Sequence, residues 1–327
     1  MTSPEDLLSR LRQAGRILVT SHANPDGDAI GSQLGLARLL RRMGKGVTVW
    51  DRDPVPAIYG ALPAAERIHT GVDAPRGFPD DFDTLVVLEC PSLDRTGLED
   101  QLAGVMPILN VDHHLGNQHY GLVNWVDVSA PAVGEMVLRL AADLKVEVDP
   151  EMASCLYLAL VSDTGGFRFS NATPRAFEAA SLLVGRGASP ERTSQWLYES
   201  RPEGMLRLLG EMLGSLELTA GGRVATALLT PEMYARAGAA QSDSEGLVDY
   251  PRSIRGVDAV AVLRSLGEGR VKVSLRSRGD GVDVERMARR RGGGGHRAAA
   301  GFEAAGDLPA LRREIAEELA RELAEPA

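Results

Sequence analysis

Short apolar runs alternate with helical patterns over residues 1–185, and this alternation constrains the fold more than any other feature. The strand-like runs are Arg16–Ser21, Val47–Trp50, Asp83–Glu89 and Ile108–Val111. The helical patterns are Asp28–Met43, Ala132–Leu144 and Glu151–Ser162, and Pro150 suits the first turn of the last one. Strands that alternate with helices favour a parallel sheet with covered faces. The sequence therefore predicts an α/β fold for this part.

The pattern changes after about Gly185. A helical connection is expected over Glu191–Leu216, followed by strand-like runs and a charged helix at Leu308–Leu323. The runs are Val224–Leu229, Ala259–Leu266 and Val271–Leu275, the last two joined by a glycine turn at 267–270. We therefore expect a larger domain over residues 1–188, a helical linker over 189–216 and a smaller α+β domain over 217–327.

Composition narrows the class of protein. The chain is 44% hydrophobic and 25% charged, which is typical of globular proteins, and no apolar run reaches the length of a membrane span. The polar segment Met1–Arg12 carries two acids and is not expected to be a signal peptide. The two cysteines, Cys90 and Cys155, each lie in an apolar stretch, so we expect a cytoplasmic protein without a disulfide framework.

The charge is distributed unevenly along the chain. The net charge is −9, yet Arg264–Arg297 holds ten basic and four acidic residues. An acidic body argues against a grip on long duplex nucleic acid, which usually needs a broad basic surface. The basic segment is either a solvated run of charges or a local clamp for a small phosphorylated ligand. The sequence leaves both alternatives open and favours the former for a run of charges alone.

Four groups of acids and histidines follow apolar segments. The first, His22, Asp26 and Asp28, lies in the tight turn after the first strand, where Asp28 could alternatively cap the next helix. The others are Glu89, Asp112-His113-His114 and Asp163. A buried carboxylate at a strand end is costly unless it is paired or metal-bound, although each of these acids could instead point to water or end a helix.

Together, these groups predict a metal centre. In open α/β sheets, ligands bind at the carboxyl ends of the strands. Carboxylate oxygens and imidazole nitrogens suit Mn²⁺ or a similar divalent ion. Two ions need about six to eight protein ligands, including one bridging carboxylate, and can hold a bridging hydroxide that attacks a phosphoryl group. Six candidates are available: His22, Asp26, Asp28, Glu89, His113 and Asp163.

The motifs resemble those of a known superfamily. His22-Ala-Asn-Pro-Asp-Gly-Asp28, Asp112-His-His114 and Ser162-Asp-Thr-Gly165 are similar to the motifs of the DHH phosphoesterases, which include RecJ-type exonucleases, family II pyrophosphatases and nanoRNase/pAp phosphatases. Ser274–Ser277 and Gly293–Gly301 resemble the DHHA1 substrate-binding domain. Motif order, spacing and length match the nanoRNase/pAp phosphatase type over essentially the whole chain.

The resemblance implies a role for each candidate residue. His22 and Asp26 would bind one Mn²⁺, and Asp28, His113 and Asp163 the other, with Glu89 bridging the two. Mg²⁺ or Co²⁺ would also suit these ligands. His114 would contact the scissile phosphate and assist the leaving oxygen, and Asp112 would orient an imidazole. The substrate contacts would come from Arg168, Arg276, Ser277, the amides of Gly292, Gly293, Gly294 and Gly295, and His296.

One residue departs from the family pattern. The family usually has Asp at the bridging position, where this chain has Glu89. The extra methylene moves the carboxylate by about one bond length, which puts the metal spacing or metal choice in question.

The resemblance implies a Mn²⁺-dependent enzyme that hydrolyses short single-stranded RNA or DNA oligomers and pAp, with the smaller domain presenting substrate across a cleft. No membrane partner is expected, and the sequence leaves open whether the protein forms a homodimer. The nearest alternative is a phosphodiesterase for a cyclic dinucleotide or pApA. A second alternative is a protein that senses nucleotides and is a poor catalyst because of Glu89. A long-range exonuclease would need additional domains, and the glycine-rich motif disfavours a pyrophosphatase.

Overall fold

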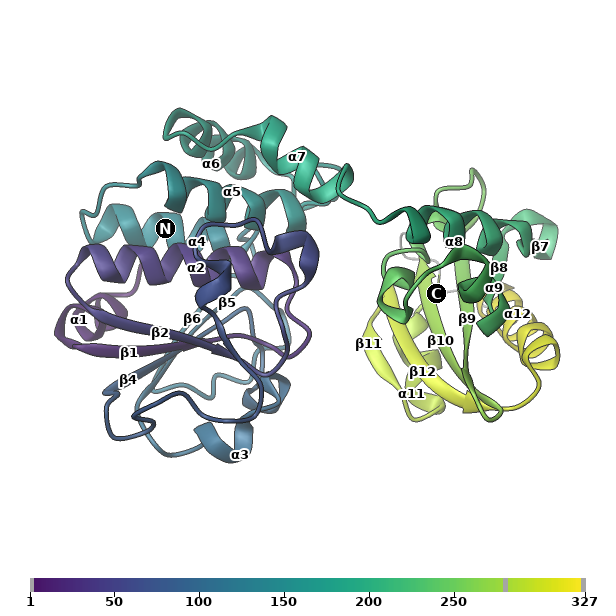
Figure 1. The fold of residues 1–327 in the computed structure, drawn as a ribbon, viewed down its shortest axis with the longest axis horizontal. Helices are drawn as coiled ribbons and strands as arrows, with labels where there is room; N and C mark the ends of the chain where they lie inside the picture. The colour runs from purple at the N-terminus through teal and green to yellow at the C-terminus, as the bar shows by residue number, and fades with distance from the viewer. Residues whose placement is uncertain (1–2, 279–281, 325–327) are drawn as a thin grey trace. The chain divides into compact units, whose positions relative to one another are not determined.

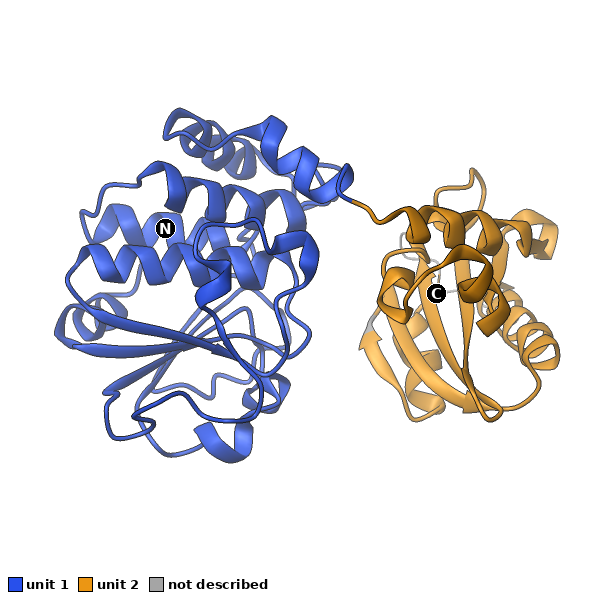
Figure 2. Cartoon of the chain, viewed as in Figure 1, with its two compact units in different colours: residues 1–200 blue, residues 201–327 orange. Residues whose placement is uncertain are grey.

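The computed structural model describes residues 3–278 and 282–324, which form two compact units (Figure 2). The first unit comprises residues 1–200 and the second residues 201–327. The helices expected between residues 189 and 216 are α7 (Pro190–Tyr198), which lies in the first unit, and α8 (Glu203–Gly214), which lies in the second. No helix among the described residues is long and apolar enough to cross a membrane.

The first unit is built on a parallel six-stranded sheet in the order β3-β2-β1-β4-β5-β6 (Figure 1). Its strands are β1 (Arg16–Thr20), β2 (Gly46–Asp51), β3 (His69–Thr70), β4 (Thr84–Leu88), β5 (Ile108–Asp112) and β6 (Val123–Val126). Its helices besides α7 are α1 (Glu5–Gln13), α2 (Gly27–Arg42), α3 (Glu99–Leu102), α4 (Val133–Asp143), α5 (Pro150–Asp163) and α6 (Pro174–Gly185). The predicted α/β architecture is confirmed.

Successive residues of the central strands enter different cores because strand side chains alternate between the two faces. Val86 and Leu88 of β4 pack with the helices α2, α4 and α5, which cover one face (Figure 1). Leu85 and Val87 pack on the other face with Leu102 of α3. The sheet is therefore buried on both faces, which explains why its strands are continuous apolar runs.

Three glycines spaced four residues apart let α2 lie close against α5. A Cβ atom on Gly27 would lie 2.3 Å from Ser162 Oγ, and one on Gly31 would lie 2.5 Å from the carbonyl oxygen of Cys155. A Cβ on Gly35 would lie 2.4 Å from a methyl carbon of Leu156. This stripe brings the start of α2, with Asp28, close to the end of α5, with Asp163.

The second unit has a mixed six-stranded sheet in the order β11-β12-β10-β9-β8-β7. Its strands are β7 (Glu217–Thr219), β8 (Val224–Leu229), β9 (Ala259–Gly267), β10 (Arg270–Ser277), β11 (Gly294–His296) and β12 (Ala299–Ala305). Its helices besides α8 are α9 (Pro231–Ala237), α10 (Asp249–Arg252), α11 (Val284–Arg290) and α12 (Leu308–Ala324). Among the strands that the structure describes in this unit, only β8 and β9 pair in parallel. Met287 and Ile315 pack on one face and Leu208 and Met212 on the other, as expected for an α+β unit.

Candidate active site

The candidate residues of the first unit follow strands β1, β4 and β5, near the point where the strand order reverses. From β1 the chain moves outward to β2 and β3, and β4 returns to the other side of β1. In doubly wound sheets, the crevice at the carboxyl ends of the strands beside such a point is where ligands bind. His22 follows β1, Glu89 follows β4 and His113 follows β5, so the topology directs all three to one edge.

His113 is surrounded by carboxylates. Its Nε2 atom lies 3.3 Å from Glu89 Oε1 and 3.9 Å from Asp163 Oδ2. Its Nδ1 atom donates a hydrogen bond to the carbonyl oxygen of Ala130 at 3.0 Å, which fixes the orientation of the ring. Burial acts to lower the pKa of His113, but the carboxylates of Glu89, Asp28 and Asp163 outweigh burial and raise that pKa to about 11.

Glu89 carries a buried carboxylate with one unsatisfied oxygen. Its side chain is 3% exposed, and Oε2 has no hydrogen-bond partner among the described residues. Burial raises the pKa of Glu89 well above its usual range, and the charge of Asp28 adds to this effect. The backbone of Glu89 has a φ of 53°, a conformation that costs a residue with a Cβ atom about 1–2 kcal/mol. A strained residue with an unpartnered buried carboxylate oxygen indicates a functional role.

Asp28 is fully buried and has almost all of its acceptor positions filled. Oδ1 accepts hydrogen bonds from Ser32 Oγ at 2.7 Å and from the Gly134 amide at 3.0 Å, and Oδ2 accepts one from the Val133 amide at 2.6 Å. A carboxylate has about four acceptor positions, so about one remains, on Oδ2. Burial raises the pKa of Asp28, although the neighbouring His113 opposes this.

Asp163 is the last residue of α5, and its carboxylate is oriented by Asn171. Asp163 Oδ2 accepts a hydrogen bond from Asn171 Nδ2 at 3.0 Å. Burial and the nearby charge of Asp28 raise the pKa of Asp163 to about 7. An acid at a helix C-terminus faces the negative end of the helix dipole, so this position favours a cation beside it.

Asp112 and His114 form a separate hydrogen-bonded pair. His114 Nδ1 donates to Asp112 Oδ1 at 2.8 Å, and Asn117 Nδ2 donates to Asp112 Oδ2 at 2.6 Å. Burial acts to raise the pKa of Asp112, but the hydrogen bonds from His114 and Asn117 outweigh burial and lower it. The charged carboxylate of Asp112 therefore fixes the orientation of the His114 ring. The ring planes of His113 and His114 meet at 88°.

His22 and Asp26 form a looser pair, with 4.0 Å between His22 Nε2 and Asp26 Oδ1. His22 Nδ1 donates to the carbonyl oxygen of Ala23 at 2.9 Å, which directs Nε2 toward Asp26. Asp26 Oδ1 also accepts a hydrogen bond from the Ala29 amide at 3.0 Å, at the start of α2. The charge of Asp26 also contributes to the raised pKa of Asp28, Glu89 and Asp163, so this pair lies beside the same cluster.

The arrangement fits divalent metal ions. Among the described residues, two groups of three bring their ligand atoms within 4.8 Å of one another, and both include His113. The groups are Glu89, His113 and His114, and Asp28, His113 and Asp163. A bound cation stabilises the charged form of buried carboxylates whose pKa values are raised, and the unsatisfied Glu89 oxygen provides a ligand atom for one.

Two of the substrate residues expected in the second unit make contacts within that unit. The Ser277 side chain is buried, and its hydroxyl donates to the carbonyl oxygen of Arg297 at 3.5 Å. Arg276 Nη1 donates to the Leu275 carbonyl oxygen at 2.9 Å, and its Nε lies 3.5 Å from Asp249 Oδ1. Burial lowers the pKa of the Arg276 guanidinium. The side chain of His296 lies outside what the structure describes.

The glycine run packs against β12. A Cβ atom on Gly293 would lie 2.2 Å from the Gly301 carbonyl oxygen, and the Gly293 amide donates to Ala288 at 2.9 Å. Gly295 has a φ of 143°, and a Cβ there would lie 2.5 Å from the Ala299 carbonyl oxygen. At Gly294, a Cβ atom would meet nothing within 4 Å in the described part of the chain. Packing therefore explains why Gly293 and Gly295 are glycines, but it gives no reason for a glycine at Gly294.

The basic segment forms ion pairs with helix α12 and its neighbours. Arg290 and Arg291 of the α11 end each contact Glu318, at 3.1 Å and 2.6 Å. Arg286 pairs with Glu322. These contacts argue against a clamp made of these arginines and favour the expected surface run of charges, although here the charges are paired with α12.

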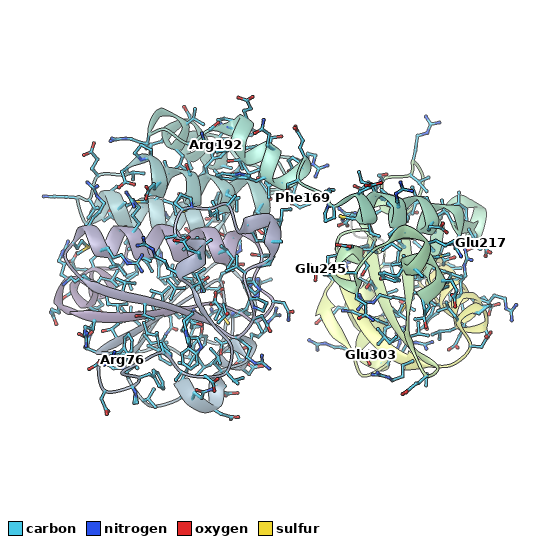
Figure 3. The ribbon with its side chains drawn as sticks, in the orientation of Figure 1. Arg76, Phe169, Arg192, Glu217, Glu245 and Glu303 are labelled. Atoms are coloured by element: carbon cyan, nitrogen blue, oxygen red, sulfur yellow. The ribbon has the colours of Figure 1, made fainter. Side chains whose placement is uncertain are left out.

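Arg168 lies after the glycine turn that follows Asp163. Its side chain is exposed, and Nε donates to the Gly165 carbonyl oxygen at 2.6 Å. The neighbouring Phe169, which Figure 3 labels, is 46% exposed, and a Cβ atom on Gly165 would lie 2.5 Å from its ring. Asn117 and Asn171, which orient Asp112 and Asp163, were missed by sequence reasoning because isolated asparagines carry no spacing signal.

Comparison with known proteins agrees with this geometry. Residues 16–160 match the N-terminal domain of the DHH family, and residues 221–323 match the DHHA1 domain. The chain is 36% identical to the bifunctional oligoribonuclease and PAP phosphatase NrnA of Thermus thermophilus, over 94% of this chain and 90% of that protein. It is 25% identical to the Bacillus subtilis protein of the same name, over 90% and 91%.

Solved structures show the same fold. An exopolyphosphatase-related protein from Bacteroides fragilis superposes with a TM-score of 0.91 at 28% identity, over 98% of both chains. The exonuclease RecJ of Thermus thermophilus superposes with a TM-score of 0.56 at 15% identity, over 98% of this chain and 55% of that one.

The fold and the site define a phosphoesterase with a DHH unit followed by a DHHA1 unit, an enzyme that hydrolyses phosphoric esters. The chain belongs to the DHH family, and within it the chain is similar to the NrnA proteins.

Proposed function

We propose that this chain is a Mn²⁺-dependent phosphoesterase that hydrolyses very short oligonucleotides to mononucleotides and removes the 3′-phosphate of pAp. The names of its relatives support the substrate class. The observation that carries the metal dependence is the buried Glu89 carboxylate, whose Oε2 lacks a partner among the described residues beside His113 and Asp163. A buried carboxylate without a partner is costly, and a bound cation removes this cost.

The residues divide into two ligand sets that share Glu89. We assign His22 and Asp26 to one ion and Asp28, His113 and Asp163 to the other, with Glu89 contributing to both. The His113 and His22 rings are already oriented for this role, because each donates Nδ1–H to a carbonyl oxygen and directs Nε2 to the acids. When bound, the ions would supply a nucleophilic water at neutral pH and neutralise charge on the phosphoryl group.

His114 is the residue that we assign to the reacting phosphate. Asp112 stays charged because its pKa is lowered, and it accepts Nδ1–H from His114. This contact fixes the tautomer in which a proton at Nδ1 faces Asp112, and it stabilises the ring when Nε2 also takes a proton. His114 can therefore hold a proton near the phosphate and pass it to the leaving oxygen.

The second unit would bind the end of the substrate. We assign this role to Arg276, the backbone at Gly294 and Gly295, and His296, with Arg168 of the first unit as an additional phosphate contact. Ser277 and Gly293 would support this surface from beneath, since the Ser277 hydroxyl and the Gly293 amide contact backbone carbonyls. We also propose the boundaries 1–188, 189–216 and 217–327 for the two domains and their linker.

The Asp163→Ala variant tests the metal assignment. With Mn²⁺ and a labelled dinucleotide, turnover should fall at least about 100-fold, because the loss removes a charged ligand of the cluster. Asp143→Ala is a matched control, since Asp143 is the last residue of α4 as Asp163 is of α5. Asp143 accepts a hydrogen bond from the Ser3 amide at 2.8 Å, and its variant should keep turnover. Wild-type turnover by Asp163→Ala would disprove the assignment.

A substrate panel with Mn²⁺ tests the substrate class. The panel contains a dinucleotide, a five-nucleotide oligomer, pAp, a cyclic dinucleotide and pyrophosphate. The proposal predicts that kcat/KM is highest for the dinucleotide or pAp. Fastest cleavage of the cyclic dinucleotide would replace this proposal with the phosphodiesterase alternative, and tight binding of pAp without product would favour a sensor.

A further inference from the structure

One loop contacts Asp28 and His113 of the Asp28, His113 and Asp163 cluster directly, and it contacts Asp163 through Asn171. This segment, residues 127–134, comprises the connection from β6 to α4 and the first two residues of α4, and it is called the ligand loop here. Its Ala130 carbonyl oxygen accepts Nδ1–H of His113 at 3.0 Å. Its last two amides, at Val133 and Gly134, donate to the carboxylate of Asp28 at 2.6 Å and 3.0 Å. A shift of this loop would therefore move two of the three side chains together.

The third member, Asp163, is tied to the same loop through Asn171. Asn171 Nδ2 lies 3.0 Å from the Pro131 carbonyl oxygen and 3.0 Å from Asp163 Oδ2. The amide thus bridges the loop backbone and the carboxylate. The loop position sets the three ligands relative to one another, and metal affinity depends on that geometry.

The outer side of the ligand loop is held by an arginine of α6. Arg175 Nη2 lies 3.0 Å from Asp127 Oδ2, and Nη1 lies 3.0 Å from Ser129 Oγ. Arg175 Nε also donates to Glu135 Oε1 at 2.9 Å, just beyond the loop. Asp127 receives a second guanidinium from Arg139 at 2.7 Å. The Asp127 and Glu135 side chains are 8% and 7% exposed, so their charges depend on these arginines.

We propose that Arg175 is a positioning residue that sets the metal affinity of the Asp28, His113 and Asp163 cluster by fixing the ligand loop. Its hydrogen-bond partners among the described residues include none of the three ligands, and it acts through the ligand loop, whose backbone contacts Asp28, His113 and Asn171. The inference rests on the proposed function, because it assumes that these ligands bind Mn²⁺. It goes beyond that function in assigning control of the affinity to a residue outside the cluster.

The fork shape of the Arg175 guanidinium allows this residue to fix the ligand loop. Arg175 reaches Asp127, Ser129 and Glu135 with three different nitrogens. A lysine has a single ammonium group that cannot span three partners in this geometry. Arg175→Lys should therefore keep the charge near Asp127 and Glu135 but loosen the loop. Arg175→Met should remove the charge and also loosen the loop.

Calorimetric titration of the metal-free protein with Mn²⁺ tests the proposal. The dissociation constant should rise about 10-fold in Arg175→Met and by a smaller factor in Arg175→Lys. Arg186→Met is the matched control, because Arg186 follows α6 and forms an exposed ion pair with Glu147 at 3.3 Å. Its dissociation constant should equal that of the wild type. Equal constants in Arg175→Met and the wild type, or an equal rise in Arg186→Met, would overturn the proposal.

Rescue by excess Mn²⁺ separates positioning from a loss of folding. The kcat of Arg175→Met on a dinucleotide should be low at limiting Mn²⁺ and recover as Mn²⁺ is raised, while KM for the dinucleotide stays unchanged. A loss that Mn²⁺ cannot restore would contradict the proposal. If Arg175→Met does not fold, Arg175→Lys and Asn171→Ala decide, since both should still weaken Mn²⁺ binding, and unchanged binding in both would overturn it.

The two proposals can fail separately. If the wild type binds Mn²⁺ and the Arg175 variants bind it equally well, only the role of Arg175 is wrong. If the wild type binds no Mn²⁺, the proposed function and the role of Arg175 are both wrong.

Discussion

The acidic cluster of the first unit and the basic segment of the second unit both gather charges, but they satisfy them differently. In the cluster, burial and the charge of Asp28 raise the pKa values of Glu89 and Asp163, and one Glu89 oxygen has no partner within the described residues. In the basic segment, Arg290 and Arg291 each contact glutamates of α12. Charges paired within the chain stabilise packing, whereas buried charges left without partners indicate a ligand.

Glutamate-to-glutamine changes in the two regions give the largest expected contrast. Glu89→Gln keeps the shape of the side chain but removes a charged ligand, so Mn²⁺-dependent turnover should fall at least about 100-fold. Glu318→Gln weakens contacts to Arg290 and Arg291 and should leave turnover unchanged, with a stability loss of about 1 kcal/mol. Turnover on a dinucleotide measures the loss of activity in each variant, and thermal unfolding measures the loss of stability. Equal turnover in the two variants would remove the distinction.

The glycine run offers a contrast within the second unit. Gly293→Ala should destabilise the protein by about 2–3 kcal/mol, because the new methyl group would overlap the backbone of Gly301. Gly294→Ala should change the free energy of unfolding by less than about 0.5 kcal/mol, since its methyl group meets no described atom within 4 Å.

The Gly294→Ala variant also tests whether the backbone of the glycine run approaches the substrate. If it does, the methyl group should raise KM for a dinucleotide several-fold without loss of stability. Chemical denaturation and steady-state kinetics on both variants separate packing from binding. An unchanged KM in Gly294→Ala would show that Gly294 is not needed for close approach.

The fold of the first unit could be predicted well from the sequence because its signals are local. The runs at Arg16–Ser21 and Asp83–Glu89 are continuous apolar strands, and β1 and β4 lie within them. In the second unit, the prediction missed β12 (Ala299–Ala305). Its alanines and glycine have little preference for strands, and its conformation depends on pairing with β10 on one side and β11 on the other.

The site was predictable as far as its residues follow strands and helices in the sequence. His22, Glu89 and His113 could be placed because the carboxyl ends of parallel strands share one edge. The contacts that orient His113 and Asp28 could not be predicted, since the Ala130 carbonyl and the Val133 amide are backbone groups that any residue type provides. The same limit applies to Arg175, whose partners become neighbours only through packing of α6 against the ligand loop.

The pH dependence of stability compares the cluster with and without metal. The folded, metal-free protein holds protons that the unfolded chain would release, because the pKa values of Asp28, Glu89, Asp163 and His113 are all raised. The stability that these four groups contribute is therefore fully present below the usual carboxyl pKa values of about 4, and it is lost as pH rises through the Asp163 pKa of about 7 toward the His113 pKa of about 11.

Mn²⁺ should reverse this slope. The ion competes with protons for the same ligands, so its affinity, and the stabilisation that it gives the folded state, should increase with pH. Denaturation at pH 5.5, 7 and 8.5, with a chelator or with saturating Mn²⁺, measures both slopes. If stability rose with pH in the metal-free protein, the cluster would not hold the extra protons, and the contrast between its crowded carboxylates and the paired charges of the basic segment would fail.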